Sequence, residues 1–359
     1  MRIPTALAAL FWLLLAPFGV QAAAPRTMVE LQWEGRTRTG TVVLHDNVTG
    51  WFLERDGRLT TLPLAEVGDY RRLGPFRPFA AVELREQLAR EFGTGFTVSA
   101  TGHYLVVSSR GSGERYGRLF EELYRQFVVA FAARGFRMTE PEFPLVAVVL
   151  PDQASFHRYC SAEQVQPQPG LRGYYLPSSN RVALYDAEAS GQSTAEGLDK
   201  TVIHEATHQV AFNTGIHSRI GVSPKWVVEG LATVFEQESV RRNDRVGPVM
   251  SRVNDERFRW FQQYRGHRPA KSLVALVQSD RLFTSQTLDA YSEAWALMFF
   301  LLETRPADAV KYLRTLAARD PLQDYSAEQR LRDFQSAFGP DLSLLEAHLL
   351  RFYDSASAE

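Results

Sequence analysis

The residues best suited to chemistry stand in one short segment, Thr201–Val210, which contains the pattern His204-Glu205-x-x-His208. Side chains four residues apart lie on the same face of a helix, so the two imidazoles can bind one metal ion. Glu205 lies about 100° around the helix from His204, where it cannot bind the same ion but can reach a water molecule on it. The pattern predicts a hydrolytic metal centre with Glu205 as general base.

The setting of this segment is apolar. Val202, Ile203 and Val210 flank the histidines, and the two residues between the glutamate and the second histidine are small. On an ordinary amphipathic helix, two histidines and a glutamate would be costly to bury, whereas a metal ion satisfies them. The single cysteine, Cys160, excludes a cysteine-rich site and is expected to be a buried small apolar residue. Any metal ligands must therefore be histidines and carboxylates.

A third ligand is needed, because catalytic zinc usually has three protein ligands and one open position. The metzincin extension is missing: Thr214 stands where that pattern has a histidine, and His217 lies beyond the expected end of the helix. Glu229 is the better candidate, since twenty residues separate it from the second histidine, a spacing that suits a second helix packed on the first. Gly230 and Ala232 are expected to let these two helices approach closely.

The expected ligands of Zn²⁺ are therefore His204, His208 and Glu229. The pattern His204-Glu205-x-x-His208 followed by Trp226-x-x-Glu229-Gly230-x-Ala232 resembles the gluzincin clan of zinc metallopeptidases, which includes thermolysin-like and aminopeptidase-like enzymes. Val228 replaces the asparagine that precedes the third ligand in thermolysin-like enzymes, so the surroundings of the site in that subfamily do not carry over.

More closely, the chain is similar to the DUF1570 domain, a bacterial family of uncharacterised proteins expected to be peptidases. In that family a Gly-aromatic-aromatic hairpin precedes the zinc helix, and a Tyr-x-x-x-Trp helix follows it. The corresponding residues here are Gly173-Tyr174-Tyr175, with Arg181–Asp186 as the return strand, and Tyr291–Trp295. The resemblance covers about residues 95–305.

The resemblance implies a zinc-dependent peptidase, in which the metal polarises the scissile carbonyl and Glu205 passes a proton from water to the leaving amine. It also implies that Tyr291 donates a hydrogen bond to the oxyanion. Tyr174 and Tyr175 are rivals for this role, and Tyr291 could equally be a core residue. Glu236, on the same helical face as the third ligand, would orient a ligand histidine or remain a solvated carboxylate.

Around these residues the sequence predicts an α+β fold: a zincin-like catalytic domain over 79–250 and a C-terminal helical subdomain over 251–354. Apolar periodicity predicts helices over Ala80–Phe92 and Gly113–Arg134, a strand pair over Phe96–Ser108, a buried strand over Leu145–Leu150, and mostly helix from Leu198 to Phe352. By the resemblance to zincins, the hairpin at Arg181–Asp186 is expected to provide the edge strand, which either binds extended peptide or is purely structural.

The segment before this domain, residues 27–74, predicts a small SH3-like β-barrel of short strands and tight turns. Asp56-Gly57 predicts a hairpin in which both positions favour positive φ. Exposed aromatic residues of such a barrel could bind a cell-envelope ligand, but in so small a barrel they more often fill the core.

The first residues predict export. A positive start at Met1-Arg2, an apolar run from Ala6 to Val20 and the small residues of Val20-Gln21-Ala22 form the pattern of a signal peptide over residues 1–22. No later stretch reaches the roughly 20 apolar residues of a transmembrane helix. The mature protein is expected to be secreted or periplasmic, with no stable membrane span.

Charge and composition limit the partners. The 40 Lys+Arg residues nearly balance 41 Asp+Glu, which argues against a protein that coats nucleic acid. The basic and aromatic residues of Arg257–Arg265 recur at helical spacing, so we expect a helix packed over the cleft rather than a nucleic-acid surface. The expected partner is a peptide or protein substrate. The alternatives are a non-catalytic zinc-containing binding module and a hydrolase of cell-wall peptide crosslinks.

Overall fold

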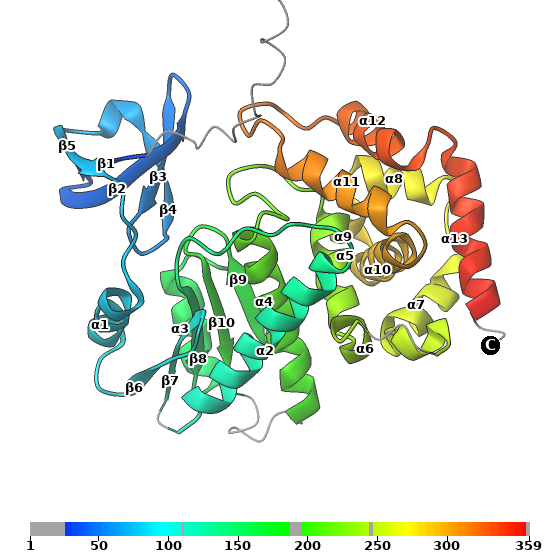
Figure 1. Cartoon of the computed structure of the whole chain (residues 1–359), viewed down its shortest axis with the longest axis horizontal. Helices are drawn as coiled ribbons and strands as arrows, with labels where there is room; N and C mark the ends of the chain where they lie inside the picture. Colours follow the sequence, from blue (N-terminus) through cyan, green and yellow to red (C-terminus); the bar gives the residue numbers. More distant parts are fainter. Residues whose placement is uncertain (1–25, 110, 187–194, 244–246, 357–359) are drawn as a thin grey trace, which may run out of the picture.

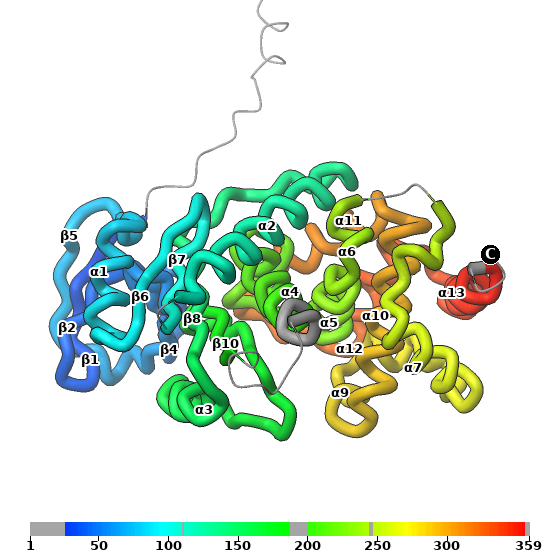
Figure 2. The backbone as a smooth tube through the Cα atoms, turned by 90° about the horizontal axis from the view of Figure 1, so that it is seen from below, coloured from blue at the N-terminus to red at the C-terminus, as the bar shows by residue number. Residues whose placement is uncertain are grey.

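The computed structural model describes residues 26–109, 111–186, 195–243 and 247–356. The predicted signal peptide, residues 1–22, lies outside these ranges. Two five-stranded sheets and a group of helices lie side by side along the long axis of the molecule (Figures 1 and 2). The structure therefore confirms the predicted α+β class and the helical C-terminal part.

The N-terminal sheet is antiparallel throughout, with strand order β4-β3-β2-β1-β5. Its elements are β1 (Thr27–Trp33), β2 (Arg36–His45), β3 (Thr49–Glu54), β4 (Leu59–Pro63), the short 3₁₀ helix η1 (Leu64–Glu66) and β5 (Tyr70–Pro75). A small core of Leu31, Phe52 and Leu62 holds it together. The predicted hairpin joins β3 to β4, but of Asp56 and Gly57 only the glycine has a positive φ, 89°.

The second sheet is mixed, with strand order β6-β7-β8-β10-β9. Its strands are β6 (Phe96–Ala100), β7 (Tyr104–Ser109), β8 (Leu145–Leu150), β9 (Gly173–Leu176) and β10 (Arg181–Tyr185). β7, β8 and β10 are parallel, whereas β6 and β9 run antiparallel at the two edges. The edge strand is thus β9 and not Arg181–Asp186, because β10 pairs with strands on both sides.

Helices cover both faces of this sheet (Figure 1). They are α1 (Ala81–Phe92), α2 (Gly113–Ala132), α3 (Gln153–Ala162) and α4 (Ala195–Asn213). Alternate residues of β8 enter two different cores: Leu145, Ala147 and Val149 pack with α2 and α4, while the intervening residues pack with α1 and α3. Because the side chains of β8 alternate between the two faces of the sheet and both faces are buried, the histidine helix α4 packs on the face that carries Leu145, Ala147 and Val149.

The C-terminal part is helical. Its elements are α5 (Lys225–Phe235), α6 (Glu238–Arg241), the 3₁₀ helix η2 (Val249–Arg252), α7 (Asp255–Arg265), α8 (Ser272–Gln278), α9 (Leu282–Ser285), α10 (Thr287–Thr304), α11 (Pro306–Ala317), α12 (Ala327–Phe338) and α13 (Leu342–Ala356). α10 is central and is buried on all sides from Ser292 to Leu302. In the part of the chain that the structure describes, no helix has the length and hydropathy needed to cross a membrane.

The predicted boundary at residue 250 does not divide the packing. One continuous core runs from Tyr104 on the second sheet to Tyr353 on the last helix. α5, which lies before the boundary, packs more extensively against α10, which lies after it, than against α4. The helix that carries Glu229 is therefore held by the C-terminal helices as well as by the histidine helix.

Gly230 makes this contact possible, and its partner differs from the predicted one. A Cβ at Gly230 would lie 2.6 Å from the backbone oxygen of Ala294 in α10. The expectation that Gly230 permits approach to the histidine helix is thus wrong: it permits approach to α10. The reason is geometric, because residue 230 lies about 100° around α5 from Glu229, which faces α4.

The N-terminal sheet docks on the second sheet through its β3–β4 hairpin. Arg58 pairs with Glu163 at 2.9 Å, and the Leu59 N–H donates to the Ser178 carbonyl at 2.6 Å. Arg219, in the segment after α4, donates to the Gly57 carbonyl at 2.7 Å and to the Pro177 carbonyl at 2.7 Å. The β3–β4 hairpin, the β9–β10 turn and the segment after the histidine helix therefore share one hydrogen-bond network.

Replacing Gly230 with alanine is expected to destabilise the fold by about 1–3 kcal/mol, because the added methyl group must push α5 away from α10. Urea unfolding followed by circular dichroism measures the change. Gly266→Ala is the matched control, since φ at Gly266 is −68° and a Cβ there would lie 3.7 Å from the nearest atom. Equal unfolding midpoints for Gly230→Ala and the wild type would contradict the packing argument.

Candidate metal centre

The candidate centre lies where α4 and α5 cross. α4 carries His204 and His208 one turn apart, and α5 carries Glu229 on the side that faces them. All three side chains are largely buried, with exposed fractions of 16%, 10% and 17%. The structure thus brings together the three residues that the sequence singled out as ligands.

Three donor atoms converge on one point. His204 Nε2 and His208 Nε2 are 3.2 Å apart, and Glu229 Oε2 lies 3.4 Å from the first and 3.6 Å from the second. The imidazole rings are nearly perpendicular, at 88°. Atoms bound at about 2.0–2.1 Å to a tetrahedral zinc ion lie about 3.3–3.4 Å from one another. The observed triangle therefore fits such an ion.

A carboxylate oxygen supports this interpretation. Glu229 Oε2 is buried and has no hydrogen-bond partner among the described residues. A buried, unsatisfied carboxylate oxygen is costly, and a cation placed between it and the two imidazoles removes the cost. Burial raises the pKa of Glu229, but the adjacent His208 and His204 outweigh it and hold that pKa well below its usual range.

Glu236 fixes the orientation of the first histidine. Its Oε1 atom lies 2.8 Å from His204 Nδ1, and its Oε2 atom accepts a 2.9 Å hydrogen bond from Asn254 Nδ2. An Nδ1–H bond to Glu236 leaves the Nε2 lone pair of His204 for a metal. Burial lowers the pKa of His204, while Glu229 and Glu236 raise it, so that it lies well above the usual value.

Glu205 lies beside the triangle without joining it. Its Oε2 atom accepts a 2.8 Å hydrogen bond from the backbone N–H of Tyr175 on the edge strand β9. The carboxylate is close enough to influence His204 electrostatically and lines the same cleft. Its carboxylate is therefore oriented by a backbone group rather than by another side chain, and it faces the cleft that His204 also lines.

Tyr291 faces the centre from α10. Burial, followed by the charge of Glu229 and a hydrogen bond to it, raises the pKa of Tyr291 well above its usual value. The hydroxyl thus keeps its proton and can donate a hydrogen bond. The ring also packs against Phe283, with centroids 5.5 Å apart.

The two rival tyrosines point elsewhere. Tyr174 is buried with Phe156 in the core on the opposite face of the sheet. The hydroxyl of Tyr175 donates to Asn180 Oδ1 at 2.9 Å, and its ring packs on Phe212. Of the three tyrosines, only Tyr291 presents its hydroxyl to the metal ligands.

A cleft of about 670 Å³ opens beside the triangle. It is bounded by the loop before β9, by α4, by the start of α7 and by Tyr291. Its charged lining residues are Arg172, Lys200, Glu205, Glu236, Glu256 and Arg257. A chain of several residues can therefore reach the candidate centre from solvent.

His217, the histidine nearest in sequence, is not part of the triangle. Burial and the nearby His208 lower the pKa of its imidazole to about 3, so that it is neutral. Its ring packs against Phe212 with centroids 5.0 Å apart. The structure agrees with the exclusion of His217 as the third ligand.

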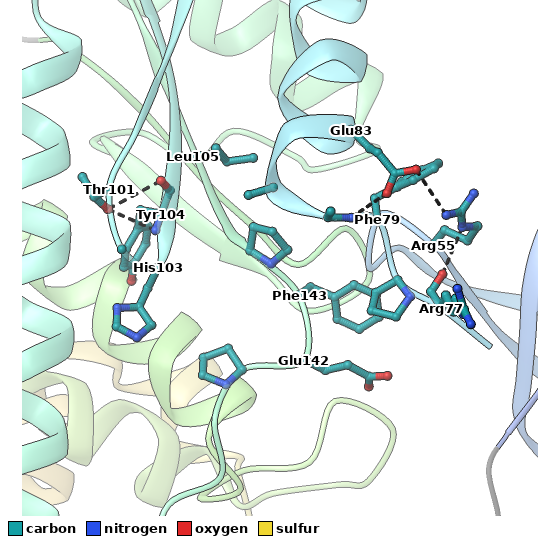
Figure 3. A pocket seen from close by; sticks show the side chains of 16 residues that line it. Arg55, Arg77, Phe79, Glu83, Thr101, His103, Tyr104, Leu105, Glu142 and Phe143 are labelled. Atoms are coloured by element: carbon teal, nitrogen blue, oxygen red, sulfur yellow. Dashed lines mark hydrogen bonds and ion pairs between the residues drawn. The ribbon is translucent and has the colours of Figure 1, made fainter. Parts of the chain in front are cut away.

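A second crevice, of about 620 Å³, lies at the junction of the N-terminal sheet and the second sheet (Figure 3). Its histidine, His103, is 2.9 Å from Glu121 Oε1 and stacks on Tyr124. Its Arg55 guanidinium donates to the Arg77 carbonyl at 3.0 Å. These groups are satisfied by neighbouring protein groups, so the crevice shows no donor set comparable to the triangle.

Sequence reasoning missed the roles of two residues near the centre: Asn254, which is buried behind Glu236, and Arg257, which lines the cleft. Asn254 caps α7 by accepting a hydrogen bond from the Arg257 N–H, and its side-chain amide holds Glu236. The run Asn-Asp-Glu at the start of a helix is a signal for an N-cap, so the capping role of Asn254 could have been predicted. Its hydrogen bond to Glu236 could not, because Glu236 lies 18 residues earlier in the chain. Arg257 was included only in a helix expected to pack over the cleft.

Replacing Glu236 with alanine is expected to weaken zinc binding by about 10- to 100-fold, because His204 loses the acceptor that orients its ring. Glu236→Gln keeps an acceptor oxygen and is expected to weaken binding less. Competition with a chromophoric chelator measures the affinities. Glu238→Gln, an exposed position on α6 paired only with Arg242, is the control. Unaltered zinc affinity in Glu236→Ala would show that the contact orients nothing.

Comparison with known proteins gives one family match and no match among curated proteins. Residues 199–323 match the family model described as "Protein of unknown function (DUF1570)". The matched segment covers 125 of 359 residues and contains the three candidate ligands, Glu205 and Tyr291; the hairpin at Gly173–Tyr175 lies outside it. The part of the chain that forms the candidate centre is therefore similar to DUF1570, which supports the family resemblance seen in the sequence.

Proposed function

We propose that the protein is a zinc-dependent peptidase of the gluzincin type. The observation that carries the proposal is the triangle of His204 Nε2, His208 Nε2 and Glu229 Oε2, whose sides of 3.2–3.6 Å suit tetrahedral zinc. A purely structural zinc site usually has four protein ligands. Here the described residues supply three, and a cleft opens beside them.

The residues around the triangle suit peptide hydrolysis. Zinc held there supplies a Lewis acid that polarises a carbonyl and lowers the pKa of water to about 7. Glu205 Oε accepts the proton of the attacking water and returns it to the leaving amine. The Tyr175 N–H holds Glu205 in place before substrate arrives. Tyr291 donates from its hydroxyl to the oxygen that becomes negatively charged.

The edge strand offers a place for the substrate backbone. β9 borders the cleft at Gly173, and the Tyr175 N–H points away from β10 toward Glu205. An extended peptide can add to such an edge through main-chain hydrogen bonds. Its scissile carbonyl would then lie between β9 and Tyr291, on the open side of the triangle.

The finer features of the fold belong to the same proposal. A mixed sheet with an antiparallel edge strand next to the histidine helix supports a zincin-like domain. The strand order β4-β3-β2-β1-β5, with a 3₁₀ helix before β5, supports an SH3-like barrel. The N-terminal pattern over residues 1–22 supports export to the periplasm or the medium.

The first test concerns the base. Glu205→Gln keeps the hydrogen bond from the Tyr175 N–H but cannot accept a proton, so peptide hydrolysis should fall by about 10²- to 10⁴-fold. Zinc content, measured by atomic emission, should remain at the wild-type level because Glu205 is not a ligand. Undiminished hydrolysis by this variant would rule out the mechanism. A wild type that holds zinc but cleaves no peptide in a broad library would favour the binding module.

The second test concerns the ligands. Glu229→Ala and His208→Ala should each abolish stoichiometric zinc binding, because two remaining donors hold the ion weakly. Chelation should lower the melting temperature of the wild type, since the ion joins α4 to α5, and should leave that of Glu229→Ala unchanged. Full zinc content in Glu229→Ala would show that the third ligand is another residue.

A further inference from the structure

Arg257 is a cation in the wall of the cleft that has no anionic partner among the described residues. It stands in the first turn of α7, and its guanidinium carbon lies 5.6 Å from the centre of the Tyr291 ring. Its Nε atom is buried and makes no hydrogen bond. Among the residues that the structure describes, its guanidinium forms no ion pair, although Glu256 lines the same cleft. Arg257 is therefore positioned by its cation–π contact with Tyr291, while its guanidinium donates no hydrogen bond to the described residues.

This arrangement suits the capture of a carboxylate. A guanidinium presents donors in a planar fork that matches both oxygens of a carboxylate. Stacking on the Tyr291 ring restricts the side chain, so less conformational entropy is lost when an anion binds. A partly buried cation with no partner is costly, and a ligand carboxylate would remove that cost.

The acids that line the cleft do not compete strongly for Arg257. Glu205 is held by the Tyr175 N–H, and Glu236 by His204 and Asn254. Glu256 is exposed and stays in solvent. Arg172 and Lys200, from the loop before β9 and from α4, line the same cleft.

We propose that Arg257 forms a carboxylate subsite next to the metal centre, so that the protein selects peptides with a negative charge close to the scissile bond. The inference rests on the proposed peptidase function for the position of the substrate. Because the Arg257 guanidinium lies 5.6 Å from the centre of the Tyr291 ring, whose hydroxyl contacts Glu229, we place the recognised carboxylate within one or two residues of the carbonyl that Tyr291 would contact. It is either the C-terminal carboxylate of the substrate or an acidic side chain.

The test measures binding as well as turnover. The zinc-loaded full chain carrying Glu205→Gln is titrated calorimetrically with acetyl-pentaalanine as the free acid and as the amide. Amidated peptides with a single Glu or Gln at each position form the second arm. A carboxylate at one position should improve affinity by about 10- to 100-fold over its neutral counterpart. Preference for the free acid identifies a C-terminal carboxylate, and preference for Glu over Gln identifies a side chain.

Variants assign the preference to its residue. Arg257→Gln should reduce the ratio of charged to neutral affinity to about one, and Arg257→Lys should retain part of it. Arg259→Gln is the matched control, because Arg259 lies on the same helix, is exposed and bonds only to the Asp255 carbonyl. It should keep the wild-type ratio. No charge preference in the Arg257 protein, or an equal preference in Arg257→Gln, would overturn the subsite.

The same peptides, tested for cleavage by the wild type, separate the two proposals. Cleavage without any charge preference would leave the peptidase standing and remove the subsite. Binding that prefers a carboxylate through Arg257, without cleavage of any peptide, would leave the subsite standing and remove the peptidase. If no peptide binds at millimolar concentration, the carboxylate subsite is also wrong.

Discussion

The rest of the site depends on holding two imidazole nitrogens and a carboxylate oxygen within 3.2–3.6 Å of one another. Two imidazole nitrogens and a carboxylate oxygen at this distance gain little from each other unless a proton or a cation lies among them. The protein holds them by packing. α4 lies on a sheet buried on both faces, and α5 is wedged between α4 and α10. Both helices are therefore fixed by contacts outside the site.

The close approach of α5 to α10 links the ligands to the cleft wall. Gly230 lets the two backbones meet, and α10 then places Tyr291 one turn before that contact, beside Glu229. Asn254 links a second pair of elements, because its side chain caps the start of α7 and also donates a hydrogen bond to Glu236. A single arrangement of helices thus supports the candidate ligand Glu229, the residue Glu236 that holds His204, and the arginine that lines the cleft.

Much of this could be predicted from sequence because the signals are local. His204 and His208 share a helical face by their spacing alone, and the buried strand Leu145–Leu150 is a continuous apolar run. The structure also agrees with Glu229 as the residue that meets the histidines, which a helix-turn-helix spacing already favoured. Contacts between elements that are distant in the sequence were not predicted correctly. Neither the partner of Gly230 nor the edge position of β9 follows from the order of residues. The first depends on how α10 packs on α5, and the second depends on the order of the strands in the sheet.

Arg257 shows a different limit of sequence reasoning. Its neighbours Phe258 and Phe261 do pack into the core, against Trp295 and Tyr353, as helical periodicity predicts. Periodicity assigns one face of a helix to the core and leaves the other faces without a role. The proposed role of Arg257 follows only from three structural observations taken together: its contact with the Tyr291 ring, its position in the cleft wall, and the lack of an acidic partner among the described residues.

The docking of the N-terminal sheet has a consequence for Glu205. The β3–β4 hairpin is hydrogen-bonded to the β9–β10 turn. Strand β9 then holds Glu205 through the backbone N–H of Tyr175. A shift of the N-terminal sheet would therefore reach the Glu205 carboxylate through the short β9–β10 hairpin. Between the docked sheet and the candidate base stands a single strand, β9.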